Sequence, residues 1–180
     1  MQNDSLHVET FDFDGWCAAT TQKHIPMQIT APGRDRFRAS MRMRTLSGID
    51  IFDIDTDPHI AKRTTALLQQ DDTRVYGITV QVTGTSIIEQ DGVRAELQPG
   101  DYAIYDSTRP FTREFPEHCR IMILRFPHNM LMLPTHSLST ITATRLAADE
   151  GLGVVVSPFL IEVARNLQEL HGWAGVRLAH

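Results

Sequence analysis

The amino-acid sequence predicts a domain that is mostly β, an antiparallel sandwich or barrel, with helices at its C-terminal end. From about residue 25 to residue 126, short runs of alternating apolar and polar residues are separated by turn signals such as Asp-Gly and Pro-Gly. From about residue 143 onward, the apolar period lengthens to that of helices. A chain of 180 residues suffices for one domain with its own core, and leaves no room for two full domains.

Composition narrows the class of protein. Hydrophobic residues make up 42% and charged residues 22% of the chain, which excludes a disordered segment. The net charge of −5 argues against binding a phosphate backbone by bulk charge. Short apolar runs and the absence of a signal-peptide pattern predict a cytoplasmic protein with no membrane partner. Cys17 and Cys119 are expected to be free thiols.

The chain divides into three predicted segments. Residues 1–24 are expected to form an arm or a short helix, with Phe13 and Trp16 as apolar anchors. Residues 25–127 are expected to form the β-barrel, and residues 128–180 a helical region.

The first strand pair is predicted over Arg36–Leu46 and Ile49–Asp57, joined by a two-residue turn at Ser47-Gly48. That register aligns Arg42 with Asp53, Arg38 with Asp57, Met43 with Phe52, and Met41 with Ile54. Arginines recur at alternate positions from Arg34 to Arg44, and their predicted neighbours across the strands are acidic. The pattern therefore favours a solvated, charge-paired sheet face over a nucleic-acid site.

Further strand and turn signals follow. The run Val75–Thr83 alternates as a strand, with Gln81 on the face opposite its apolar residues. A hairpin is predicted to turn at Asp91-Gly92, and Pro99-Gly100 is predicted to form a tight turn in which glycine supplies positive φ. The remaining predicted strands are Tyr102–Tyr105, Phe111–Phe115 and Cys119–Phe126.

An ordered series of motifs spans most of the chain, from about Phe13 to His171. Its members are Gln81, Gly84, Pro99, Gly100, Asp101, Tyr105, Asp106, Arg109, Pro110, Phe126 and Pro127. The series resembles the cupin-type ligand-sensing domain found N-terminal in AraC/XylS-type transcription regulators. The Pro-Gly-Asp turn occurs throughout cupin-like barrels, but its combination with the Arg109-Pro110 turn is specific to this resemblance.

The resemblance implies a cupin-like double-stranded β-helix, that is, a jelly-roll barrel, followed by helices that pair two subunits. It also implies DNA binding through a C-terminal helix-turn-helix region, which this sequence does not contain. The expected function is therefore effector sensing and dimerisation in an AraC-type regulator, with an unknown small-molecule effector and a homodimer as partners. The alternative is a stand-alone, metal-free cupin enzyme of the isomerase or epimerase type.

Enzymatic activity finds little support in the motifs. Cupin metal enzymes place ligands in a His-x-His pair and in a further histidine after the Pro-Gly-Asp turn, and this sequence has neither. Its eight histidines are scattered singly. Tyr76, Tyr102, Tyr105 and His118 are possible acid or base groups, but no spacing signature marks them. We therefore expect no metal, no cofactor, no catalytic residue and no enzyme.

Four polar or aromatic residues near the predicted barrel mouth are candidates for binding an effector: Tyr76, Gln81, Tyr105 and Arg109. Each also has a structural interpretation. Gln81 suits an exposed strand position, Tyr105 suits the core, and Arg109 suits an ion pair with Asp106 that braces their own turn.

The predicted C-terminal helix has an apolar stripe at spacings of 3, 4 and 3, formed by Leu160, Val163, Leu167 and Leu170. Ser157 suits an N-cap with Pro158 as the first helical residue, although Val154–Val156 could extend the helix upstream. The stripe either packs on its own barrel or pairs with a second subunit, and the family resemblance favours it as the dimerisation surface.

Overall fold

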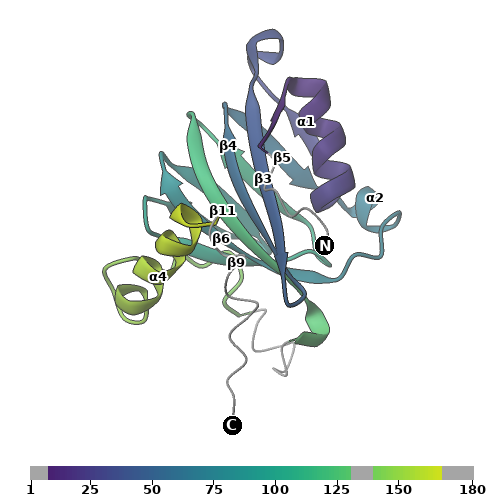
Figure 1. Cartoon of the computed structure of the whole chain (residues 1–180). Coiled ribbons are helices and arrows are strands. Elements are labelled where there is room, and N and C mark those ends of the chain that lie inside the picture. Colours follow the sequence, from purple (N-terminus) through teal and green to yellow (C-terminus); the bar gives the residue numbers. More distant parts are fainter. Residues whose placement is uncertain (1–7, 131–139, 168–180) are drawn as a thin grey trace, which may run out of the picture.

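Two antiparallel sheets pack face to face in the computed structural model, which describes residues 8–130 and 140–167 (Figure 1). The first sheet has the strand order β1 (Glu9–Phe11), β3 (Ala39–Leu46), β4 (Ile49–Thr56), β11 (Cys119–Pro127), β6 (Val75–Thr83) and β9 (Tyr102–Asp106). The second has the order β2 (Gln28–Thr30), β5 (His59–Arg63), β10 (Phe111–Phe115), β7 (Ser86–Gln90) and β8 (Val93–Leu97). The predicted mostly-β, cupin-like jelly roll with a C-terminal helix is confirmed.

The register of the first hairpin, β3 with β4, agrees with the sequence pattern. All three predicted pairs within the two strands are present: Arg42 with Asp53, Met43 with Phe52, and Met41 with Ile54. Ser47 and Gly48 both have positive φ, 50° and 84°, as a two-residue turn that follows the strand twist requires. The second predicted hairpin turns in the same way, with φ of 53° at Asp91 and 78° at Gly92.

The arginine row differs from the prediction at its start. The strand begins at Ala39, because Arg34–Arg36 forms a short 3₁₀ helix, η2, and the Arg34 guanidinium pairs with Asp14 at 2.6 Å. Charge pairing is present further along, with Arg42 Nη2 lying 2.6 Å from Asp53 Oδ2. The face is not solvated as expected, since only 3% of Asp53 and 5% of Arg44 is exposed.

The N-terminal segment closes one side of the barrel. Helix α1 (Phe13–Ala19) continues as a π-helical turn, η1 (Thr20–His24). Asp12 is the N-cap of α1, and its carboxylate accepts a hydrogen bond from Gly15 N over 2.9 Å. In Figure 1 the helix lies beside β3 and β5, one strand from each sheet. Its buried residues Phe13 and Trp16 therefore join the core between the sheets.

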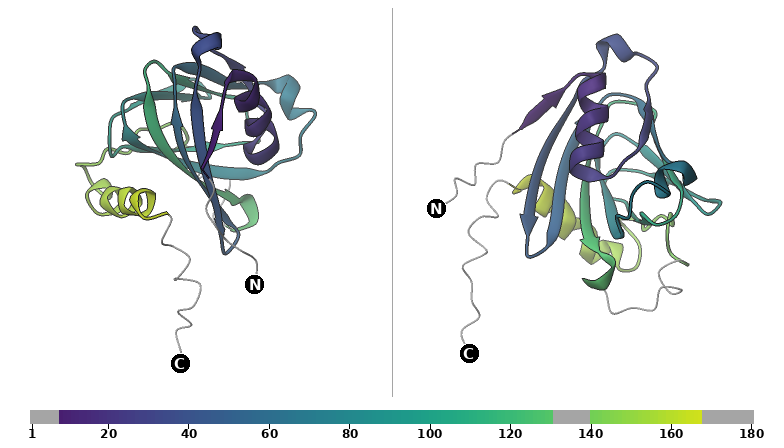
Figure 2. Two further views of the ribbon diagram at one scale, coloured as in Figure 1. Left: turned by 45° about the horizontal axis from the view of Figure 1, so that its top comes forward. Right: turned by 90° about the vertical axis from the view of Figure 1, so that its right-hand side faces the viewer.

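Helix α4 (Gly153–Arg165) packs on part of the outer face of the first sheet, and the left view of Figure 2 shows it outside the barrel. Leu160 and Leu167 pack there against Val80 and Met122. The described residues of the stripe therefore pack on their own barrel, which is one of the two interpretations that the sequence allowed. Val163 packs against the same cluster and is partly buried. Leu170 lies outside the described residues.

The start of α4 corrects one prediction. Ser157 is not an N-cap, because the helix extends upstream through Val154–Val156 and Pro158 lies inside it. The Ser157 hydroxyl instead donates to the Gly100 carbonyl over 2.6 Å, which ties the helix to the Pro-Gly-Asp turn. Gly100 adopts φ 93° there. A Cβ at Gly100 would lie 2.9 Å from Ala148 Cβ, so the close approach requires glycine.

The remaining described elements are short: helix α2 (Thr65–Leu68) and the 3₁₀ turn η3 (His128–Met130). The turn η1 ends at His24 and strand β11 ends at Pro127, which are the last residues of the first two predicted segments. Residues 140–152 are turns and bridges rather than helix, and two of those bridges extend the first sheet beyond β9. Among the described helices none is long and apolar enough to cross a membrane.

Candidate functional site

A cavity of about 30 Å³ lies between the two sheets, with α1 and η1 forming one side. We call it the inner cavity. Its apolar wall consists of Trp16, Met27, Ile29, Met41, Ile54, Ala61, Phe115, Ile121 and Ile123. Its polar wall residues are Thr20, His24, His59 and Arg113. A mostly apolar lining with a few convergent polar groups is the usual composition of a small-molecule site, although this cavity is small.

Arg113 carries a charge into this chamber. Alternation along β10 turns Phe111, Arg113 and Phe115 to the same, inner side, and only 5% of Arg113 is exposed. Its Nη2 donates to Thr79 Oγ1 over 2.6 Å, and its Cζ lies 4.3 Å from the centre of the Tyr105 ring. Burial lowers the pKa of Arg113 from its ordinary value.

The Arg113 guanidinium lacks a countercharge within the described residues. No described carboxylate forms an ion pair with it, and its buried Nε has no hydrogen-bond partner among them. The ring of Tyr105 offers a cation–π contact and Thr79 a neutral acceptor, and neither supplies negative charge. A buried charge of this kind is costly to keep without an anion.

Both ring nitrogens of the neutral His59 imidazole have hydrogen-bond partners. Its Nδ1 lies 2.9 Å from the Asp57 carbonyl, to which it donates, and its Nε2 accepts from Trp16 Nε1 over 3.4 Å. The ring stacks on Phe115 with centroids 4.5 Å apart. Burial lowers the pKa of His59 to about 4, so the ring stays neutral near pH 7.

His24 brings a second polar group to the cavity from η1. Its Nε2 lies 3.3 Å from the Tyr105 hydroxyl, while its buried Nδ1 has no hydrogen-bond partner in the described part of the chain. Burial is the main reason that its pKa lies well below the ordinary value, followed by the positive charges of Arg113, Arg125 and Arg63. The surroundings of His24 are therefore positively charged.

Two of the four predicted effector contacts lie inside the barrel. Tyr105 is fully buried, beneath Arg113 and against His24. Gln81 is also fully buried, which corrects the exposed position considered for it. Its amide is occupied, since Nε2 donates to Thr83 O over 2.9 Å and Oε1 accepts from Ser86 Oγ over 2.6 Å. Gln81 therefore braces the strand end rather than facing the cavity.

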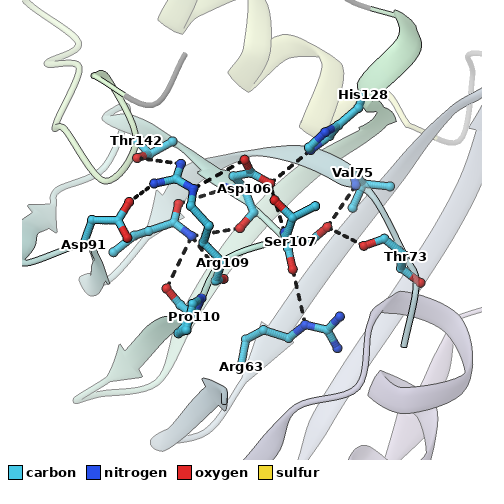
Figure 3. A network of polar contacts seen from close by, with 12 residues as sticks. Arg63, Thr73, Val75, Asp91, Asp106, Ser107, Arg109, Pro110, His128 and Thr142 are labelled. Carbon is cyan, nitrogen blue, oxygen red and sulfur yellow. Dashed lines mark hydrogen bonds and ion pairs between the residues drawn. The ribbon is translucent and has the colours of Figure 1, made fainter. Parts of the chain in front are cut away.

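The other two predicted contacts lie outside the inner cavity. Tyr76 points to the outer face of β6 and stacks on His128, with ring centroids 3.9 Å apart. Arg109 pairs with Asp91 and lies 3.5 Å from Asp106, in the network drawn in Figure 3. This geometry agrees with the bracing role considered for Arg109, and the four residues do not converge on one site.

That network holds the turn between β9 and β10 in place. Gln90 Nε2 donates to the Asp106 carbonyl over 2.8 Å, and Gln90 Oε1 accepts from Asp106 N over 3.0 Å. The Asp106 carboxylate accepts from Thr108 N over 2.9 Å and lies 3.0 Å from His128 Nε2 (Figure 3). Arg109 Nη2 also donates to Thr142 Oγ1 over 3.4 Å, so the turn contacts the segment that leads to α4.

The Pro-Gly-Asp turn makes a second link to that segment. The Asp101 carboxylate accepts from Arg145 Nε over 2.6 Å and from Ala148 N over 3.0 Å. Burial opposes ionisation of Asp101, but these contacts and Gln98 N–H hold its pKa below the ordinary value. The turn is therefore a docking point for the chain that connects the barrel to α4.

Metal and thiol chemistry have no evident centre in the described part of the chain. No three His, Cys, Asp or Glu side chains gather there in a way that could hold a metal ion. Both cysteines are free thiols, and burial raises the pKa of Cys119 to about 11. A thiol with so high a pKa is not an activated nucleophile.

Sequence reasoning missed the polar residues that do meet in the inner cavity: His24, His59 and Arg113. One signal for Arg113 was available, because it alternates with Phe111 and Phe115 on a strand and must share their buried face. The two histidines had no such signal. His24 and His59 come from different elements, and only the closure of the barrel by α1 and η1 brings them together.

Known proteins show the same architecture. The crystal structure of the AraC-like transcriptional activator CuxR superposes with a TM-score of 0.78 at 18% identity, over 91% of this chain and 61% of that one. An uncharacterised protein in the nit 5′ region of Bacillus sp. (strain OxB-1) is 24% identical over 97% of this chain and 69% of its own length.

The transcriptional activator NphR of Rhodococcus sp. is 24% identical over 83% of this chain, and the match spans 45% of that activator. The family model described as AraC-binding-like domain matches residues 16–180. Because this match covers most of the chain, the chain belongs to the AraC-binding-like domain family, which confirms the resemblance carried by its turn motifs.

Proposed function

We propose that this chain senses a small-molecule effector for an AraC-type transcription regulator. The observation that carries the proposal is the inner cavity, an apolar chamber with buried polar groups and one wall made by a helix. Membership in the AraC-binding-like domain family supports the same function. DNA contacts are proposed for a part of the regulator other than this domain, and the protein is proposed to work in the cytoplasm.

We propose that two parts of the fold transmit the effect of ligand binding away from the cavity. The first is α1 with η1, because Trp16, Thr20 and His24 line the cavity directly. The second is β9, which carries Tyr105 on its inner side and pairs with residues 142 and 146 at its edge. A ligand that binds better to one arrangement of these elements would shift the population toward it.

We further propose that the chain is not an enzyme. Inside the cavity the two nitrogens of His59 are both engaged, so neither is available to move a proton of a substrate. Burial raises the pKa of Tyr105 above its ordinary value, and its hydroxyl faces His24. Among the described residues of the cavity, the free Nδ1 of His24 has no free acid beside it to complete the acid and base pair that a metal-free isomerase needs.

Self-association is proposed to use a different face of α4 from the one the sequence suggested. Leu160 and Leu167 are covered by the first sheet and are not available to a partner. Leu152, Val155 and Phe159 are 79%, 73% and 62% exposed, and their spacing of 3 and 4 places them on one side of the helix. We propose that a second copy of the chain covers this apolar side in a homodimer.

The sensing proposal is tested by filling the inner cavity. Ala61 lines the cavity and Lys62, its neighbour on β5, is exposed. In a reporter assay with the regulator that carries this domain, Ala61→Leu should abolish the response to inducer, while Lys62→Leu should leave it intact. An unchanged response in Ala61→Leu would place the effector elsewhere.

A further inference from the structure

We infer that the effector of this domain is a small monocarboxylate, whose carboxylate binds Arg113 and whose apolar remainder occupies the inner cavity. The inference rests on the proposed sensing function and adds the chemical class of the ligand.

Arg113 differs in its charge pairing from other arginines of the two sheets. Arg63 pairs with Asp71 at 2.5 Å, Arg120 with Asp53 at 2.7 Å and Arg125 with Asp50 at 2.6 Å. Only 5% of Arg113 is exposed, and no described acid pairs with it. One uncompensated guanidinium calls for one negative charge, which a monocarboxylate supplies.

The Arg113 guanidinium is already held in place beside the cavity. Thr79 and the Tyr105 ring hold one side of it, while its Nε–H has no partner within the described residues. The buried Nδ1 of His24, another wall residue, also has none. Burial is the main cause of the low pKa of His24, and the positive charges of Arg113, Arg125 and Arg63 add to it, so this part of the wall favours an anion over a cation.

The cavity wall also restricts the rest of the ligand. Apart from its four polar residues the wall is built of aliphatic and aromatic side chains, so the part of the ligand beyond the carboxylate must be apolar. A volume of about 30 Å³ is small and sets a limit on size. Met27 and Met41 are adaptable side chains, and α1 with η1 must yield for any acid larger than the smallest ones.

The experiment compares acids with their amides, which have nearly the same shape and no charge. Acetate, butyrate, hexanoate and benzoate are titrated into the purified chain against acetamide, butyramide, hexanamide and benzamide. Binding is followed by calorimetry and by Trp16 fluorescence in a Trp173→Phe background, since Trp16 lines the cavity. We expect at least one acid to bind about tenfold or more tightly than its amide.

Variants assign that preference to a residue. Arg113→Gln should lose the acid-over-amide preference, Arg113→Lys should retain part of it, and Arg94→Gln, at an exposed arginine, should keep it whole. In the absence of ligand, Arg113→Met should melt at or above the wild-type temperature, because a buried guanidinium without an anion does not stabilise the fold.

Three results would overturn the inference: no acid binds, amides bind as well as acids, or Arg113→Met melts well below wild type because the guanidinium serves the fold. If amides bind as tightly as acids and Ala61→Leu blocks both, the cavity still binds a ligand. That result would refute the carboxylate as the recognised group and leave the sensing function intact. A regulator whose Ala61→Leu variant still responds to inducer would refute the sensing function itself.

Discussion

The indole Nε1–H of Trp16 donates a hydrogen bond to Nε2 of His59 over 3.4 Å. The two residues lie on α1 and β5, so this bond joins the N-terminal helix to the second sheet inside the barrel. His59 can accept it only while Nε2 is unprotonated, since Nδ1 carries the proton donated to Asp57 O. This hydrogen bond between α1 and β5 therefore depends on the charge of one imidazole.

Acidification should destabilise the fold through His59. Its pKa is about 4 in the folded chain against 6.5 for the free side chain, so the unfolded state binds this proton more readily. The stabilisation is complete above pH 6.5 and is lost as the pH falls toward 4. The loss in the free energy of unfolding should be about 3 kcal/mol.

Urea unfolding at a series of pH values would measure this slope. His59→Gln should show a shallower slope, and the remainder should come chiefly from His24, whose pKa is lowered in the same direction. Equal slopes in wild type and His59→Gln would contradict the assignment.

Trp16→Phe should destabilise the chain by about 1–2 kcal/mol. Phenylalanine keeps most of the apolar volume, but it removes the only donor to His59 Nε2 among the described contacts, and His59 is 3% exposed. Chemical denaturation would measure the change. Thr21→Ala, which removes an exposed hydroxyl of the same helical segment, is the control and should change stability little.

Asp101→Asn should loosen the connection between the barrel and α4. The substitution removes the charge that binds Arg145 and weakens the acceptor for Ala148 N–H. We expect faster amide exchange in α4 with little change in β4 and β11, as measured by hydrogen–deuterium exchange. Asp149→Asn, at an exposed position nearby, should leave exchange unchanged. A uniform increase in amide exchange over the whole chain would instead indicate global destabilisation.

Phe159→Asp and Leu167→Asp should have opposite effects on assembly and stability. Phe159 is 62% exposed, so an aspartate there should shift a concentration-dependent dimer toward monomer without changing the melting temperature much. Leu167 is 1% exposed, so an aspartate there should destabilise the chain by several kcal/mol. Sedimentation and thermal melting separate the two effects. A monomeric wild type at high concentration would refute the dimer.

Local patterns in the sequence determined most of the strands and the pairing and turns of two hairpins. The register of β3 with β4 follows from matching apolar and charged residues across Ser47-Gly48, and the Asp91-Gly92 hairpin follows from turn chemistry alone. These features depend on residues within one or two strands of each other, for which alternation and turn preferences are sufficient. The family was identified from the same turns, whose order along the chain is itself information in the sequence.

The location of the functional site depended on contacts between elements that are distant in the chain. Trp16, His59 and Arg113 meet only because α1 closes the space between two sheets. The apolar stripe of α4 looked equally suited to a partner, and only the presence of Val80 and Met122 beneath it showed that Leu160 and Leu167 belong to the core. Periodicity tells which residues share a face, but the surface that covers that face is determined by packing across the whole domain.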